Sequence, residues 1–254
     1  MNIDFFRLDG IHPLGDSAVH PIEPLATRLG SVMLWTADLQ AWQEAPAAWL
    51  ADLDDAERAQ CQRFRRPGDR LAYAAAHALL RRALGASLGL PVASLRFARD
   101  ALGKPFLQPP GSIDFSLSHT TGMVAVALSS AGPVGVDVEA LDRTRVPTQD
   151  WGAFGLSAAQ ERHLATLAGP QQNQAFLALW TAREAVSKAD GRGLALPLQC
   201  IQVDLCGKSA TVLALVAEPP RHWRLWCNQP SGRHVLALAW QPNGSEMLQM
   251  GALL

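Results

Sequence analysis

The sequence predicts an α+β fold made of two similar halves that meet near Pro133. The chain has 254 residues, which is enough for one large domain or two small ones. Its composition, with 48% apolar and 18% charged residues, is typical of a globular protein. Each half contains a pair of helical patterns and about three extended patterns. The likeness between the halves is one of element order, without a repeat of fixed period.

In the first half, the residues before Ser31 are irregular and contain several prolines. Alternating apolar residues predict a strand over 31–39. One helix is expected from Pro46 to about Arg65, and a second one, rich in Ala and Leu, over 69–88. Later apolar runs predict further strands, with turns between them: strands at 95–100, 113–119 and 123–129, turns at 103–106 and 120–122.

The second half begins with an apolar strand over 133–139. Two helical patterns follow at 157–168 and 172–189, and a loop with two glycines is expected at 191–197. The remaining apolar runs predict three strands, near 200–205, 210–217 and 234–240.

Charge, cysteine usage and hydropathy limit the function classes. The net charge is −1, so a protein that coats nucleic acid is not expected. The four cysteines form no CxxC pair and have no histidine at zinc spacing, which indicates reduced thiols at Cys61, Cys200, Cys206 and Cys227. No signal peptide or membrane-spanning run is recognised, so the sequence predicts a cytoplasmic protein without membrane contact.

Two carboxylates lie two residues apart in the expected strand GVDVE, at Asp137 and Glu139. Side chains at this spacing point to the same face of a strand. Because like charges repel, such a pair is unfavourable unless a cation or a proton lies between the two acids. The alternative is an edge strand on which both acids are solvated.

The expected helix over 172–189 places Trp180, Glu184 and Lys188 along one stripe. One interpretation is an ordinary surface pair of Glu184 and Lys188. The other is a stripe that lines a cleft, because it begins with a large apolar ring. Arg183 lies about 100° round the helix from this stripe. It is expected to face away from the stripe, so that its substitution costs far less activity than substitution of Glu184.

Ser118 and His119 end an expected strand just before a turn at Gly122, where backbone N–H groups can meet an anion. Adjacent strand residues face apart, so the two do not form a nucleophilic pair, and the chain has no GxSxG motif. The alternative for His119 is a histidine that is bonded to backbone at a strand end.

A basic cluster in the first half predicts a local positive field that suits a small polyanionic ligand. Its members are Arg58, Arg63, Arg65, Arg66, Arg70, Arg81 and Arg82, with Arg99 and Lys104 beyond them.

Five segments, taken in this order, resemble the Sfp-type 4′-phosphopantetheinyl transferases. They are RF at 63–64 with Asp69 behind it, GKP at 103–105, FSLSH at 115–119, GVDVE at 135–139 and WTAREAVSKADGRGLALP at 180–197. Together they span about 135 residues, and the last two segments are the most specific.

The resemblance implies the phosphopantetheinyl transferase fold, in which two α+β subdomains (1–133 and 134–254) in pseudo-twofold arrangement enclose coenzyme A. It implies transfer of 4′-phosphopantetheine from coenzyme A to a serine of an apo acyl or peptidyl carrier protein, with adenosine 3′,5′-bisphosphate as by-product. It also implies Mg²⁺, held by Asp137, Glu139 and Glu184. Since one chain builds both walls of the cleft, a monomer is expected.

The resemblance also assigns roles to single residues. Glu184 would accept the serine proton, directly or through water, and Lys188 would donate to the leaving oxygen. The coenzyme A phosphates would be bound by Lys104, Ser118 and His119, with Arg63 and Arg99 near the 3′-phosphate. The sequence departs from some members of the family in this region of the first subdomain, at Glu57, Arg58, Ala59, Gln60, Tyr73 and His77.

Two other functions would use part of the same pattern. A non-catalytic protein of the same fold would bind coenzyme A or a carrier domain, but the set of Asp137, Glu139, Glu184 and Lys188 is intact. A different Mg²⁺-dependent phosphate enzyme would leave the GKP and FSLSH segments unexplained.

Overall fold

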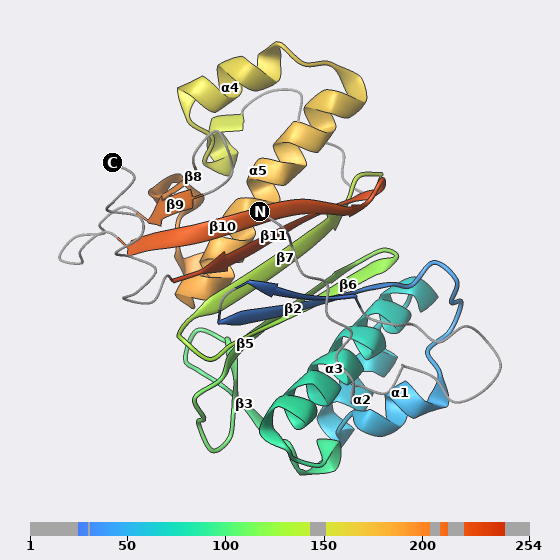
Figure 1. Ribbon diagram of the computed structural model, residues 1–254. Coiled ribbons are helices and arrows are strands. Elements are labelled where there is room, and N and C mark those ends of the chain that lie inside the picture. Colours follow the sequence, from blue (N-terminus) through green and yellow to red (C-terminus); the bar gives the residue numbers. More distant parts are fainter. Residues whose placement is uncertain (1–24, 30, 143–150, 204–208, 213–220, 242–254) are drawn as a thin grey trace.

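The computed structural model describes residues 25–29, 31–142, 151–203, 209–212 and 221–241. Two antiparallel sheets form its centre (Figure 1). The first sheet has the order β1 (Leu25–Leu29), β2 (Val32–Asp38), β6 (Met123–Ser129) and β5 (Asp114–Thr120). The second has the order β7 (Val134–Ala140), β11 (His234–Trp240), β10 (Arg221–Ser231), β9 (Ser209–Val212) and β8 (Ile201–Val203). A separate two-stranded ribbon joins β3 (Phe97–Arg99) to β4 (Pro105–Leu107).

One long helix covers each sheet (Figure 1). Helix α3 (Pro67–Leu88) packs on β5 and β6, and α5 (Gly169–Asp190) packs on β7 and β11. Both helices have a proline in the first turn, where its missing N–H costs nothing. Both end at a left-handed glycine, Gly89 with φ 64° and Gly191 with φ 86°, because only glycine adopts this cap without strain.

A short helix with a capping box precedes each long one. Asp54 and Glu57 cap α2 (Asp55–Arg63), and Ser157 and Gln160 cap α4 (Ala158–Ala165). A further helix, α1 (Ala47–Asp52), precedes α2. The two halves therefore share the α+β plan that the element order predicts.

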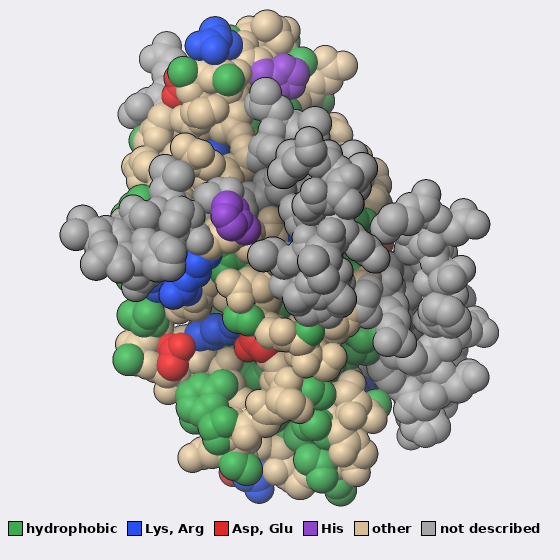
Figure 2. Space-filling model, turned by 60° about the vertical axis from the view of Figure 1, so that its left-hand side comes forward, with side chains coloured by type: hydrophobic (Ala, Val, Ile, Leu, Met, Phe, Trp, Pro, Cys, Tyr) green, Lys and Arg blue, Asp and Glu red, His purple; other side chains and the backbone are tan. Residues whose placement is uncertain are grey.

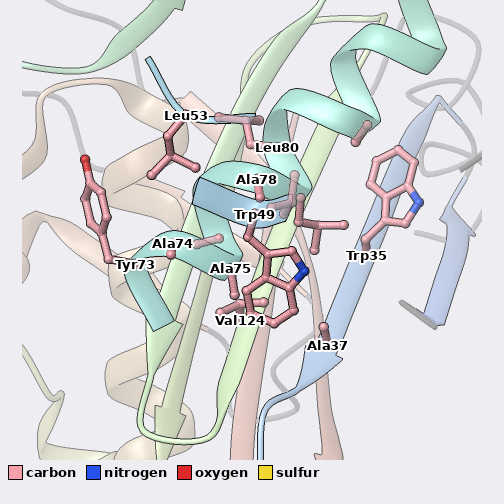
Figure 3. Packing of buried hydrophobic residues seen from close by; sticks show 14 of the residues in the cluster. Trp35, Ala37, Trp49, Leu53, Tyr73, Ala74, Ala75, Ala78, Leu80 and Val124 are labelled. Atoms are coloured by element: carbon pink, nitrogen blue, oxygen red, sulfur yellow. The ribbon is translucent and has the colours of Figure 1, made fainter. Parts of the chain in front are cut away.

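The first core lies between α3 and its sheet. Alanines on α3 let the helix approach the sheet closely, and Trp35 and Trp49 fill the remaining space. In Figure 3, Trp49 lies beside Ala75, and Tyr73 points away toward the edge of the cluster. The size of the two indoles makes this core dense, since each buries a large apolar surface.

A further core joins the two halves. It contains strand residues of the first sheet, such as Leu34 and Ala125, together with Val136, Leu236 and Leu238 of the second sheet. Strands β5 and β7, the edges of their sheets, lie side by side along this boundary. The halves are therefore packed against each other through a continuous apolar layer.

Several expectations need correction. The single helix expected from Pro46 to Arg65 is two helices, because Leu53 is extended and Asp54 caps a new start. The turn expected at 103–106 includes the start of β4, which pairs with β3. Strands β1 and β10 were not expected. The sequence of β10 contains charged residues and Pro230, and its buried apolar residues are Trp223 and Leu225 alone.

Other expectations are confirmed, or lie outside the described residues. The strands at 31–39, 113–119, 123–129, 133–139 and 234–240 are present within one or two residues. Residues 1–24, Cys206 and the ends of the strands expected at 200–205 and 210–217 lie outside the described ranges. The described parts of these two strands belong to β8 and β9. Cys61 and Cys200 are free thiols. None of the described helices combines the length and the apolarity that a membrane span requires.

Candidate functional site

Side chains of β5 link the two sheets. The backbone N–H groups of three alternate residues of β7 donate to three alternate polar side chains of β5: Val134 to Asp114 at 2.8 Å, Val136 to Ser116 at 3.0 Å and Val138 to Ser118 at 3.3 Å. Alternate residues share a face of a strand, so these three side chains lie in one row along β5. Their oxygen atoms accept the N–H groups of β7 that a neighbouring strand would otherwise accept. We call this row of hydrogen bonds the seam.

A buried ion pair lies at the seam. Asp137 is 5% exposed, and its Oδ1 accepts from Lys188 Nζ at 2.7 Å and from Ser118 Oγ at 2.9 Å. Lys188 Nζ also donates to Ser118 Oγ and to the carbonyl of Val136, each at 3.1 Å. The sequence-predicted residues Ser118, Asp137 and Lys188 therefore form one cluster that draws on both halves.

A glycine permits this approach of α5 to β7. A side chain at Gly135 would lie 2.0 Å from the carbonyl oxygen of Ala185, which is backbone and cannot move aside. Because α5 can therefore pack directly on β7, its Lys188 reaches Asp137. The glycine of the GVDVE segment thus has a packing role, and the acid two residues later has the polar one.

Glu184 lies one turn before Lys188 on α5 and is half-buried. Burial raises the pKa of its carboxyl group, Asp137 raises it further, and Lys188 lowers it. These couplings place Glu184 in the electrostatic field of the ion pair. It does not belong to the lining of the cavity described next.

A cavity of about 1010 Å³ opens between the two halves. Its walls come from α2, α3, the β3–β4 ribbon, β5, β7 and the end of α5, and they include Ser118, Asp137, Glu139 and Lys188. Its size suits a large cofactor, since ordinary ligand sites measure about 300–1,000 Å³. On one face of the molecule, acidic and basic side chains lie side by side rather than in one basic patch (Figure 2).

Three rings in contact form part of the cavity wall in the first half. Tyr73 stacks on His77 with ring centroids 4.0 Å apart, and His119 meets Tyr73 edge-on at 6.2 Å. Nδ1 of His77 lies 2.9 Å from Glu57. Burial alone would raise the pKa of Glu57, but hydrogen bonds from His77 and Arg81 outweigh it and lower that pKa. Burial and the charge of Glu57 raise the pKa of Tyr73 to about 12, so its hydroxyl stays protonated.

The structure brings most of the basic residues that were expected to bind phosphates to the cavity. Arg99, Lys104 and His119 line it. Nζ of Lys104 is 2.8 Å from Asp114, and the guanidinium of Arg99 donates to the carbonyl of Gly103. Arg63 is exposed on α2, bonds Gln60 and is not a lining residue.

The basic cluster of the first half does not supply the expected field. None of its seven arginines lines the cavity, although all of them lie in the described part of the chain. Arg58, Arg81 and Arg82 form ion pairs with neighbouring carboxylates instead. The positive charge at the cavity therefore comes from the β3–β4 ribbon and α5.

Arg183 faces away from the ion pair, as expected, but it is not a tolerant position. The side chain is 1% exposed and bonds Gln160 at 2.7 Å and the carbonyl of Gly155 at 2.8 Å. A change there removes buried hydrogen bonds, so a loss of activity would partly report a loss of folding. The expectation of a mild Arg183→Gln variant overlooked this burial.

The acidic residues can hold a divalent cation. Among the described residues, no three His, Cys, Asp or Glu side chains stand together as a ready-made metal site. Oδ2 of Asp137, however, is buried without a hydrogen-bond partner, which is costly unless another group binds it. Glu139 lines the same cavity, and Glu184 is coupled to Asp137. Carboxylate oxygens are the donors that Mg²⁺ prefers, so this set fits the ion.

Sequence reasoning missed Asp114 and Ser116 and gave no role to the Glu57–His77 pair. The alternation of Asp114, Ser116 and Ser118 along β5 was a usable signal, because polar residues at every second position mark one face of a strand. The bond between Glu57 and His77 joins two helices, and local periodicity contains no signal for it.

Comparison with known proteins identifies the family of this chain. Residues 133–239 match the family model of the 4′-phosphopantetheinyl transferase superfamily, and residues 34–131 match that of the 4′-phosphopantetheinyl transferase N-terminal region. The 4′-phosphopantetheinyl transferase HetI of Nostoc is 30% identical over 87% of this chain and 95% of its own length. The 4′-phosphopantetheinyl transferase Sfp of Bacillus subtilis is 26% identical over 64% of this chain and 71% of its own length. The chain therefore belongs to the Sfp-type 4′-phosphopantetheinyl transferase family and has the α+β fold of these enzymes.

Proposed function

We propose that this enzyme transfers 4′-phosphopantetheine from coenzyme A to a serine of an apo acyl or peptidyl carrier protein, with Mg²⁺ as cofactor. The observation that carries the proposal is the Asp137–Lys188–Ser118 cluster at the wall of a large cavity. It combines a buried acid that lacks a partner on one oxygen with a cation beside it.

In this reaction the serine oxygen forms a bond to the phosphorus that carries pantetheine. The bond from that phosphorus to the bridging oxygen breaks, and adenosine 3′,5′-bisphosphate leaves. Mg²⁺, held by Asp137, Glu139 and Glu184, would supply positive charge that stabilises the transferring phosphate.

The residues of the chain supply the remaining steps. Glu184 accepts the serine proton, directly or through water. Lys188 faces the leaving oxygen and neutralises its charge. Lys104, Ser118 and His119 bind phosphates from the cavity wall, and Arg99 extends this surface along the ribbon.

The proposal extends to the state in which the enzyme works. Both walls of the cavity come from one chain, which supports a monomer. A cytoplasmic location is proposed because coenzyme A and carrier proteins would be met there.

Intact-mass measurement of apo carrier domains tests the proposal. Incubation with this protein, coenzyme A and Mg²⁺ should add one phosphopantetheine group to a carrier domain. A carrier domain with the acceptor serine changed to alanine should stay unmodified. Chelation of divalent metal should abolish transfer but only weaken coenzyme A binding, because the ion acts most on charge in the transition state.

Asp137→Asn is the matched variant of the protein, since it keeps the shape and removes the charge. It should bind coenzyme A and fail to transfer. Tight binding of coenzyme A or of a carrier by the wild-type protein without any transfer would instead indicate a non-catalytic binding protein. Transfer that survives thorough chelation would contradict the metal site.

A further inference from the structure

The seam ends at an acidic residue to which the proposed reaction gives no role. Asp114 is the first residue of β5, and its Oδ2 accepts from the backbone N–H of Val134 and from Lys104 Nζ, both at 2.8 Å. The side chains of Lys104 and Asp114 are 19% and 28% exposed, so the pair is largely withdrawn from water. One oxygen atom thus connects β5, the start of β7 and the β3–β4 ribbon.

The ribbon needs such an anchor. Its two strands have three residues each and pair only with each other within the described chain. An isolated two-stranded ribbon is marginally stable at best. Phe97 holds one strand by packing on Phe115, with ring centroids 5.5 Å apart. The bond from Lys104 to Asp114 holds the other strand at its start.

We propose that Asp114 is a positioning residue for coenzyme A: it holds Lys104 at the cavity wall in the orientation in which Lys104 binds a phosphate. The proposal rests on the proposed function, since it takes coenzyme A as the occupant of the cavity. Asp114 is not among the lining residues, so it acts through Lys104 and not on the ligand directly. A lysine has a long, flexible side chain, and fixing it beforehand removes an entropy cost from binding.

Electrostatics and positioning predict opposite signs for the loss of this carboxylate. A negative charge beside Lys104 repels a polyanionic ligand, so charge alone predicts that Asp114→Asn tightens coenzyme A binding. Positioning predicts weaker binding, because Lys104 is released from the wall. The sign of the change in KM therefore separates the two.

The test is the KM for coenzyme A of Asp114→Asn in the transfer reaction, with calorimetric affinity as a second readout. The amide oxygen of asparagine still accepts the N–H of Val134, so the seam is kept, while Lys104 loses the negative charge that holds it at the same oxygen. We expect KM to rise about five- to tenfold, the size of the charge assistance lost from one hydrogen bond, with kcat kept. Asp114→Ser is a second variant without the carboxylate. Its hydroxyl can accept the N–H of Val134, as Ser116 accepts that of Val136, and KM should rise in the same way.

Two controls assign the effect to Lys104. In a Lys104→Ala background, Asp114→Asn should change KM no further, because the two residues act as one unit. Asp52→Asn breaks the pair of Asp52 with Arg82, whose side chains are 20% and 17% exposed, away from the cavity. It should leave the KM for coenzyme A unchanged, and thermal melts confirm that each variant is folded.

The outcomes are distinct. An unchanged or lowered KM in folded Asp114→Asn and Asp114→Ser, with active wild-type protein, overturns the positioning role and leaves the proposed function intact. A further rise in the Lys104→Ala background also overturns it. If wild-type protein neither binds coenzyme A nor modifies a carrier, the proposed function fails and this inference fails with it.

Discussion

The two long helices each bury one arginine at the same position, counted from the start of the helix. Arg81 of α3 and Arg183 of α5 are both 1% exposed. Each bonds the capping-box residue of the preceding short helix, Glu57 for Arg81 and Gln160 for Arg183. Both halves therefore lock a short helix onto a long one in the same way.

The charge around the two arginines differs. Arg81 bonds Asp54 as well as Glu57, so it lies between two carboxylates. The acceptors of Arg183 in the described part of the chain are the amide oxygen of Gln160 and two backbone carbonyls. Burial without a carboxylate lowers the pKa of Arg183 to about 10.

The difference follows from what each arrangement supports. Glu57 also bonds His77, which stacks on Tyr73 in the cavity wall. Gln160 instead donates to the carbonyl of Val203 in β8, at the edge of the second sheet. One packing solution thus serves the cavity in the first half and the sheet edge in the second.

The largest expected effect is that of Arg81→Met. Removal of the guanidinium breaks the buried pair with Glu57, which keeps its bond to His77, and the half-exposed pair with Asp54. Breaking a buried ion pair in this way costs about 3–5 kcal/mol. Urea unfolding measures the free energy of unfolding. A loss no larger than that of Arg183→Met would show that the carboxylates do not distinguish the two halves.

Glu184→Gln tests whether chemistry belongs to one half alone. Arg82 occupies the position on α3 that Glu184 occupies on α5, counted from the helix starts. Glu184→Gln should lower the transfer rate by about two orders of magnitude or more, about 3 kcal/mol, since it removes a metal ligand and a base. Arg82→Gln should change the rate little. Steady-state transfer to one apo carrier, with thermal melts, measures both; equal losses would contradict the assignment.

Arg183→Met tests the buried arginine of the second half. It leaves only neutral acceptors unsatisfied, so the free energy of unfolding should fall by about 1–3 kcal/mol, less than for Arg81→Met. Transfer per folded molecule should be kept, because the guanidinium of Arg183 bonds Gln160 and backbone carbonyls and not the Asp137–Lys188 pair. A selective loss of activity in fully folded protein would place Arg183 in the site.

The smallest effect concerns pH. Hydrogen bonds from His77 and Arg81 hold the pKa of Glu57 below its ordinary value despite burial, so its contribution to stability is present above about pH 4.5 and is lost as the pH falls through the lowered pKa. Glu57→Gln places in the capping box of α2 the neutral residue that α4 has at Gln160. Its melting temperature should fall less steeply with acidification than that of the wild-type protein. Parallel slopes would mean that Glu57 is not linked to acid stability.

Much of the fold was accessible to local reasoning. The Ala-rich pattern predicted α3, alternating apolar residues predicted β2, and apolar runs predicted β5, β6, β7 and β11. The β10 strand was missed because only its inward residues, Trp223 and Leu225, are buried, while the charged Arg224 lies between them. Its partners, β9 and β11, decide its conformation.

The candidate site divides in the same manner. The i, i+4 spacing of Glu184 and Lys188 on a helix was readable in the sequence, because backbone geometry alone puts such residues on one face. The partner that each site residue contacts in the folded chain was not readable. Arg63 lies away from the cavity, Arg183 is buried and Lys104 is held by Asp114.

Short-range order in the chain was thus enough for the element types, the pairing of residues on one face and the α+β plan, since these depend on repeats of two or 3.6 residues. The seam, the Asp137–Lys188 pair and the anchoring of Lys104 exist only once distant segments pack together. Their energies depend on burial and on the charge that lies opposite, and neither quantity is defined until the two halves meet.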